Sequence, residues 1–133
     1  AREAVEAGAA LLLLPGAGEG FTEAGRRALR PWSDAVLGAG GRVDARELAA
    51  PEGDRVAGRW LRRLQHLDRV RLRDGAAVAL WAQDDAGRHP LLAGWREGPA
   101  RVLCWTGDLR AVTTDDDAAA RWWAAVIALR DGL

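Results

Sequence analysis

The chain contains no Lys, Met, Tyr or Asn, and its only cysteine is Cys104. A single thiol excludes an internal disulfide and a metal site built from several cysteines. The 19 basic residues, all Arg, are balanced by 19 acidic ones, so the formal net charge is zero. This balance removes the general electrostatic case for binding nucleic acid or an anionic membrane surface. No apolar run approaches the roughly 18 residues of a membrane-spanning helix, so we expect no direct membrane insertion of this segment.

The missing residue types are those with AT-rich codons, whereas Ala (28 residues) and Gly (16 residues) are abundant. This bias indicates a very GC-rich genome. The length of 133 residues fits one domain, and 49% hydrophobic with 29% charged residues is typical of a globular fold. The sequence starts at Ala1 rather than Met, and residues 2–8 have the composition of a helix end. We therefore expect a single domain over residues 1–133, cut from a longer protein.

The first part of the chain predicts a parallel crossover. Residues 9–14 form an unbroken apolar run, which is typical of a strand buried on both faces. Thr22 predicts the start of a helix over residues 23–30, and residues 42–48 alternate like a second strand. A strand, a helix and a strand in this order predict two parallel strands joined by a right-handed connection.

The second part predicts a helix followed by a meander. Asp54 predicts the N-cap of a helix that ends at about Leu67. The apolar stripe of this helix would be Val56, Trp60, Leu61, Leu64 and Leu67. Four extended segments follow, at residues 69–73, 76–83, 90–96 and 101–106, and the turns between them have hairpin spacing. Four such segments predict an antiparallel meander.

The C-terminal segment predicts a helix with Thr114 as its N-cap. Residues 115–117 are all Asp, and carboxylates in a first turn favour the helix dipole. The predicted inward stripe consists of Ala119, Trp122, Trp123, Val126 and Ile127. The fold class is therefore α/β, with a mixed sheet made of a parallel strand pair extended by an antiparallel meander, and with helices packed on it.

Few residues offer catalytic or metal chemistry. The loop at residues 16–20 reads GAGEG, which lacks the spacing and the Lys of a phosphate loop, so we interpret it as a plain turn. Cys104 lies in an alternating apolar segment, which favours core packing over a nucleophile. His66 and His89 have no second ligand nearby for zinc. Asp108 with residues 115–117 is the one acidic cluster; we favour helix capping there over a cation site.

The seven tryptophans are many for this length. Trp81, Trp95 and Trp105 occur on three consecutive predicted strands, and parity allows them to share one face. An exposed row would be a stacking platform for sugar rings, and a buried row would pack under the C-terminal helix. We favour burial and keep a carbohydrate-binding module as the alternative.

Four segments together resemble glutamine amidotransferase-like domains of the flavodoxin-like fold. Residues 3–16 (EAVEAGAALLLLPG) are similar to a helix followed by the GGGLL passage of these domains. Residues 90–93 (PLLA) with residues 98–108 (GPARVLCWTGD) resemble the ending PLL…GRVL-x-x-T-x-D, and residues 121–127 (RWWAAVI) resemble the final FW helix. The resemblance covers about 50 residues and departs from the pattern at Ala9 and Ala10, which replace glycines, and at Pro99-Ala100.

The resemblance implies a three-layer flavodoxin-like arrangement and a bacterial membrane-associated parent with von Willebrand factor A modules. Active members carry a Cys on a nucleophile elbow and a His-x-Glu pair, and nothing here matches either. Cys104 does not correspond to that nucleophile, so no catalytic, cofactor-binding or metal-binding residue is carried over.

We expect a non-catalytic accessory domain without a cofactor, which binds a protein partner or the remainder of its parent chain. The resemblance favours the extracytoplasmic side of the bacterial envelope, with the cytoplasm as the alternative. A second alternative function is half of an active amidotransferase or hydrolase whose nucleophile lies upstream.

Overall fold

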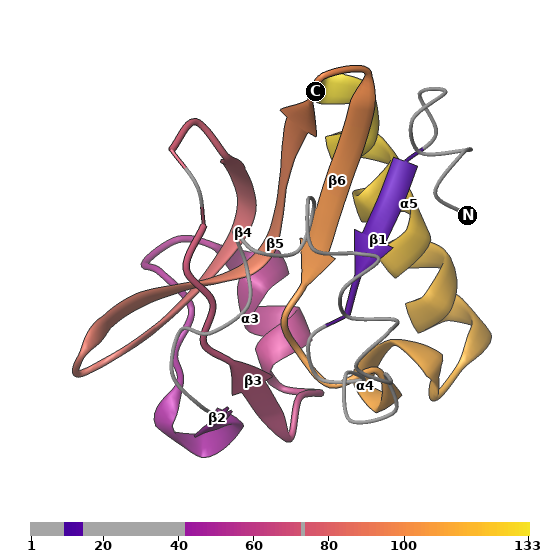
Figure 1. Ribbon diagram of the computed structural model, residues 1–133. Coiled ribbons are helices and arrows are strands. Elements are labelled where there is room, and N and C mark those ends of the chain that lie inside the picture. Colours follow the sequence, from indigo (N-terminus) through magenta and orange to yellow (C-terminus); the bar gives the residue numbers. More distant parts are fainter. Residues whose placement is uncertain (1–9, 15–41, 73) are drawn as a thin grey trace, which may run out of the picture.

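A computed structural model describes residues 10–14, 42–72 and 74–133. Figure 1 shows an α/β arrangement in which helices lie against a mixed sheet. The strands of these residues are β1 (Ala10–Leu13), β2 (Arg42–Asp44), β3 (His66–Asp68), β4 (Ala77–Asp84), β5 (Gly87–Glu97) and β6 (Ala100–Trp105). The helices are the 3-10 helix η2 (Ala45–Glu47) and the α-helices α3 (Arg55–Leu61), α4 (Arg110–Thr113) and α5 (Asp116–Gly132).

The main sheet has the strand order β1-β6-β5-β4. Strand β1 runs parallel to β6, with Leu12 opposite Leu103, and the other neighbours are antiparallel. The prediction of a parallel strand in residues 9–14 is therefore confirmed over the described part, as is the mixed sheet. The three leucines of β1 are half-buried rather than fully buried. Residues 2–8, the loop at 16–20 and the predicted helix at 23–30 lie outside the described residues.

The prediction that residues 42–48 form the parallel neighbour of β1 is wrong. Residues 42–44 form β2, which pairs antiparallel with β3 in a separate two-stranded sheet. The strand stops at Asp44 because its carboxylate accepts a hydrogen bond from the backbone N–H of Arg46 and thereby caps η2. The parallel pair therefore joins the first and last strands of the described sheet instead of two strands linked by a short crossover.

The meander is confirmed for the last three predicted strands, which are β4, β5 and β6. Asp84 accepts hydrogen bonds from the backbone N–H groups of Ala86 and Gly87 in the first turn. Gly98 has a φ of 59° in the second turn, a conformation that favours glycine. Residues 69–72 are not a strand, and α3 ends at Leu61 instead of about Leu67.

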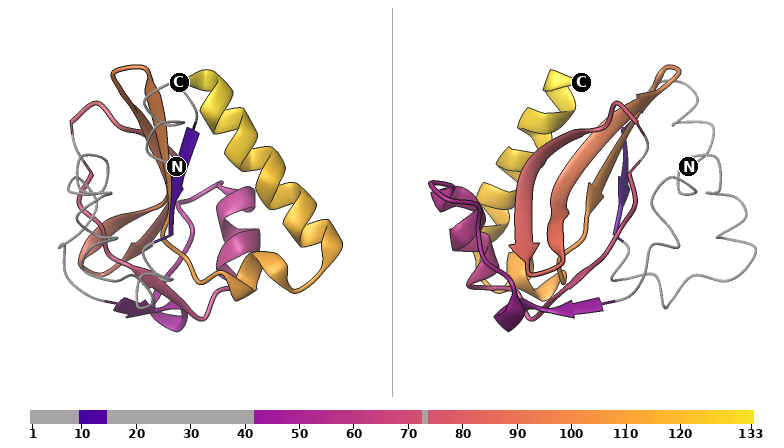
Figure 2. Two further views of the ribbon diagram at one scale, coloured as in Figure 1. Left: turned by 45° about the vertical axis from the view of Figure 1, so that its right-hand side comes forward. Right: turned by 90° about the vertical axis from the view of Figure 1, so that its left-hand side faces the viewer.

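Helices α3 and α5 lie on the same side of the main sheet, as both views of Figure 2 show. The main core consists of side chains from these helices and from the sheet. Trp105 lies at its centre with no exposed surface. Its ring meets Trp60 edge-on at 6.0 Å between centroids and Trp122 at 5.9 Å. A smaller cluster on the opposite face contains Trp95, Ala100, Val102 and Cys104.

Helix α5 faces the core with a different stripe from the one predicted. Its N-cap is Asp115, whose carboxylate accepts a hydrogen bond from the Ala118 N–H, whereas Thr114 ends α4. The buried positions are Ala118, Trp122 and Val126, at intervals of four. Trp123 and Ile127 are 52% and 42% exposed, because each is rotated about 100° from its buried neighbour along the helix.

The stripe predicted for α3 also needs a correction. Val56 is 51% exposed, while the other four residues of that stripe are buried. Leu64 and Leu67 reach the core from the segment after α3 rather than from the helix.

Among the described residues, none of the helices combines the length and the hydropathy of a membrane span.

Trp105 gives the first prediction. We expect Trp105→Ala to lower the free energy of unfolding by about 3–5 kcal/mol, because it empties the space between two other indoles. Urea denaturation followed by circular dichroism would measure this loss. The control Val56→Ala, at an exposed position, should change stability by about 0.5 kcal/mol or less. Losses of similar size in both variants would contradict the central role of Trp105.

Candidate functional site

The three tryptophans that could form a stacking platform do not share a face. Trp95 (3% exposed) belongs to the small cluster, and Trp105 (0% exposed) belongs to the main core on the opposite face. In the register of the β5–β6 hairpin, Trp95 lies opposite Val102, whereas Trp105 lies opposite Leu92. Trp81, on β4, is half-buried. The prediction of burial is confirmed for Trp95 and Trp105, and the shared row is wrong, which removes the basis for a carbohydrate platform.

Cys104 is the penultimate residue of β6 and lies between Leu13 of β1 and Ala93 of β5. Its side chain has no exposed surface, as its apolar sequence context predicts. Burial, with a smaller contribution from the negative charge of Asp68, raises the pKa of the thiol to about 12. At neutral pH the thiol is therefore protonated and shielded, which is the opposite of an activated nucleophile.

The two histidines lie in different parts of the fold. His89 Nε2 lies 3.0 Å from Asp84 Oδ1, and this hydrogen bond is the largest contribution that lowers the pKa of Asp84. His66 belongs to β3 on the small sheet. In residues 10–14, 42–72 and 74–133, no three His, Cys, Asp or Glu side chains gather in a way that could hold a metal ion.

Two residues of the predicted acidic cluster, Asp108 and Asp115, accept hydrogen bonds from protein groups. Asp108 is 6% exposed, and its Oδ1 accepts hydrogen bonds from the backbone N–H groups of Gln65 (2.8 Å) and His66 (3.3 Å). Asp115 caps α5 and lies 2.9 Å from Arg63 Nη1. The hydrogen bond from the Ala118 N–H, and to a smaller extent the one from Arg63, keep the pKa of Asp115 below its usual value. The prediction of helix capping is confirmed for Asp115. Asp108, which follows β6, instead binds the backbone at the start of β3.

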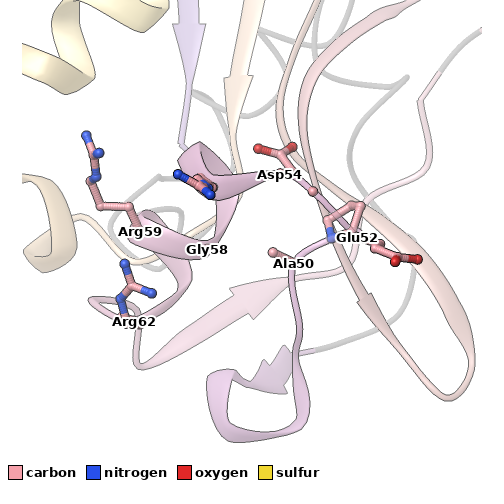
Figure 3. A pocket seen from close by; sticks show the side chains of 9 residues that line it. Ala50, Glu52, Asp54, Gly58, Arg59 and Arg62 are labelled. Atoms are coloured by element: carbon pink, nitrogen blue, oxygen red, sulfur yellow. The ribbon is translucent and has the colours of Figure 1, made fainter.

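Helix α3 borders an open hollow of about 580 Å³, shown in Figure 3. Arg59 and Arg62 lie on one side of it, and Glu52 and Asp54 lie on the other. Asp54 is already engaged, because it accepts the Ala57 N–H as the predicted N-cap. Three arginines and two carboxylates line the hollow, so their formal charges nearly cancel, and the open shape does not exclude water. This hollow therefore provides neither an enclosed reaction space nor a strongly charged site.

The outer face of α5 is the feature that packing within the described residues leaves unexplained. It consists of the exposed residues Ala120, Trp123, Ala124, Ile127 and Ala128. Figure 2 shows α5 at the outside of the molecule, with the sheet on one side only. The indole of Trp123 contacts that of Trp122 edge-on at 4.9 Å, so the buried ring supports the exposed one. A contiguous apolar face with a supported aromatic ring is typical of a protein-binding surface.

Sequence reasoning missed this surface because it assigned Trp123 and Ile127 to the core. The signal was present in the sequence: apolar residues occupy nearly the whole circumference of residues 118–129, more than one inward stripe requires.

Comparisons of the chain with protein families, with curated proteins and with solved structures find no match.

The burial of Cys104 gives a prediction about its reactivity. We expect the folded protein to react with a disulfide reagent at pH 8 at least about a hundredfold more slowly than the protein in concentrated urea. The raised pKa keeps the thiolate scarce below pH 12, and packing blocks access to it. Absorbance of the released thiol product would measure both rates on this single cysteine. Equal rates would show that Cys104 is accessible in the native state.

Asp108 gives a second prediction for this region. Asp108→Ala removes the acceptor of two part-buried hydrogen bonds from the backbone N–H groups of Gln65 and His66, so we expect a loss of about 1–3 kcal/mol in the free energy of unfolding. Asp85→Ala, at an exposed turn position, is the matched control and should have almost no effect. Full stability of the Asp108→Ala variant would disprove the fastening role of this carboxylate.

Proposed function

We propose that the chain is a non-catalytic accessory domain that binds protein through the outer face of α5. The exposure of Trp123 and Ile127 on one apolar helix face is the observation that carries this proposal. Burying such a face against another protein removes apolar surface from water, which is the main driving force of association. Tryptophan is also among the residues most enriched at the energetic centres of protein interfaces.

The contact between Trp122 and Trp123 supports the choice of surface. A side chain that is already held in place loses less conformational freedom on binding than a freely rotating one. Trp122 is 4% exposed and is anchored against Trp105 in the core. Trp123 therefore extends a rigid aromatic group outward from the core and can serve as an anchor for a partner.

The resemblance to amidotransferase-like domains supplies the wider context of the proposal. If the resemblance holds, the domain has the three-layer flavodoxin-like arrangement and belongs to a larger protein of the bacterial envelope, with the extracytoplasmic side favoured. The parallel neighbours β1 and β6 and the helix α5 on the sheet support this assignment. The shielded, protonated thiol of Cys104 supports an accessory role rather than a catalytic one.

Photo-crosslinking at two positions tests the proposal. Benzoylphenylalanine replaces Trp123 in one variant and Val56 in the other, in the cells that naturally produce the protein. The two positions are matched because they are 52% and 51% exposed. We expect defined crosslinked products from position 123, and much weaker or no products from position 56, because only the first lies on the outer face of α5.

The mass of each product identifies what lies on the helix. Products of equal yield from both positions, or none from position 123, would contradict a docking role for this face. Circular dichroism of both purified variants controls for correct folding.

A further inference from the structure

We propose that the outer face of α5 binds the same face of a second copy of this chain, with the two helices antiparallel. This inference rests on the proposed docking role of that face and names its partner. It is carried by the spacing and the charges of five positions along the outside of α5: Asp116, Ala120, Trp123, Ile127 and Arg130.

The five positions form a straight seam. They are separated by four, three, four and three residues, which is the spacing that keeps side chains in line when two α-helices pack along each other. Ala120, Trp123 and Ile127 make the middle of the seam apolar, and all three are exposed. The helix has 17 residues and is therefore about 26 Å long, enough for this seam.

The seam is complementary to itself when it is reversed about Trp123. In an antiparallel pair with a two-fold axis, the two Trp123 side chains meet at the centre, and each Ala120 faces an Ile127 of the other copy. A small side chain thus lies opposite a large one at both flanking positions, which lets the helices approach closely. A two-fold axis is also the commonest symmetry of protein dimers.

The charges select the antiparallel orientation. Asp116 lies seven residues before Trp123 and Arg130 lies seven residues after it, so each carboxylate faces a guanidinium of the other copy. Asp116 is exposed, and the Arg130 side chain is 41% exposed and donates to Asp131 through Nε and one terminal nitrogen. A guanidinium has five N–H donors, so Arg130 can bind a second carboxylate. A parallel pair would instead bring Asp116 against Asp116 and Arg130 against Arg130.

The size of the contact sets the expected affinity. One pair of four-turn helices lies at the small end of specific interfaces, below about 1,200 Å². We therefore expect a dissociation constant in the micromolar range, so that the dimer forms only at raised concentration. Burial of two indoles and two Ile side chains would provide most of the association energy.

Sedimentation of the purified 133-residue chain over a concentration series tests the inference. We expect a reversible monomer–dimer equilibrium that Trp123→Ala weakens at least about tenfold. Val56→Ala, at an equally exposed position on α3, should leave it unchanged. Circular dichroism confirms that each variant is folded.

Charge reversal tests the antiparallel register. Asp116→Arg and Arg130→Asp should each weaken self-association, because each variant places two like charges opposite one another at both ends of the seam. An equimolar mixture of the two variants should form dimers again, since every Arg then faces an Asp. Within one chain these positions are about 21 Å apart along the helix, so a purely structural defect would not be rescued by mixing.

The possible failures are distinct. A chain that stays monomeric at millimolar concentration, or dimers that Trp123→Ala does not affect, would overturn the inference. If position 123 then crosslinks to a different protein, the docking role of α5 stands and only the identity of the partner is wrong. If position 123 also gives no crosslinks, both proposals fail.

Discussion

The packing of Trp105 between Trp60 and Trp122 is the contact on which the arrangement of the described elements depends. The three indoles come from β6, from α3 and from α5. Trp105 contacts each of the other two edge-on, at 6.0 Å and 5.9 Å between ring centroids, and these contacts fix both helices against the same face of the sheet. Gly107 follows directly, and a Cβ there would lie 2.6 Å from Leu64 and 3.1 Å from the Trp105 ring. The chain therefore needs a glycine where it leaves the sheet beside this indole.

The same constraint determines where the remaining apolar surface goes. Once Trp122 is fixed against Trp105, the rotation of α5 about its axis is fixed as well. Trp123 then lies about 100° away from Trp122 and reaches the outside of the helix. An apolar helix that packs on one side only must expose its other apolar side, so the anchored core and the exposed face have a single cause.

Local features could be predicted from the sequence because they depend on neighbouring residues. Asp54 as an N-cap, the strands around residues 76–83, 90–96 and 101–106, and the buried Cys104 all follow from short-range patterns. Features set by distant contacts could not be predicted. The end of α3 is one example, because the carboxylate of Asp108, 43 positions from Gln65, binds the extended backbone there. The pairing of β1 with β6 rather than with residues 42–48 is another.

The tryptophan row shows how one turn changes a prediction about function. The sequence around Gly98 leaves the loop length open, and parity then permits Trp95 and Trp105 on either the same face or opposite faces. The structure has only Gly98 and Pro99 between the two strands, which pairs Glu97 with Ala100 and hence Trp95 with Val102. Alternation along β6 then places Trp105 on the other face. Among the tryptophans that the structure describes, Trp123 is the one with a largely exposed side chain, and it is the one that we propose for recognition.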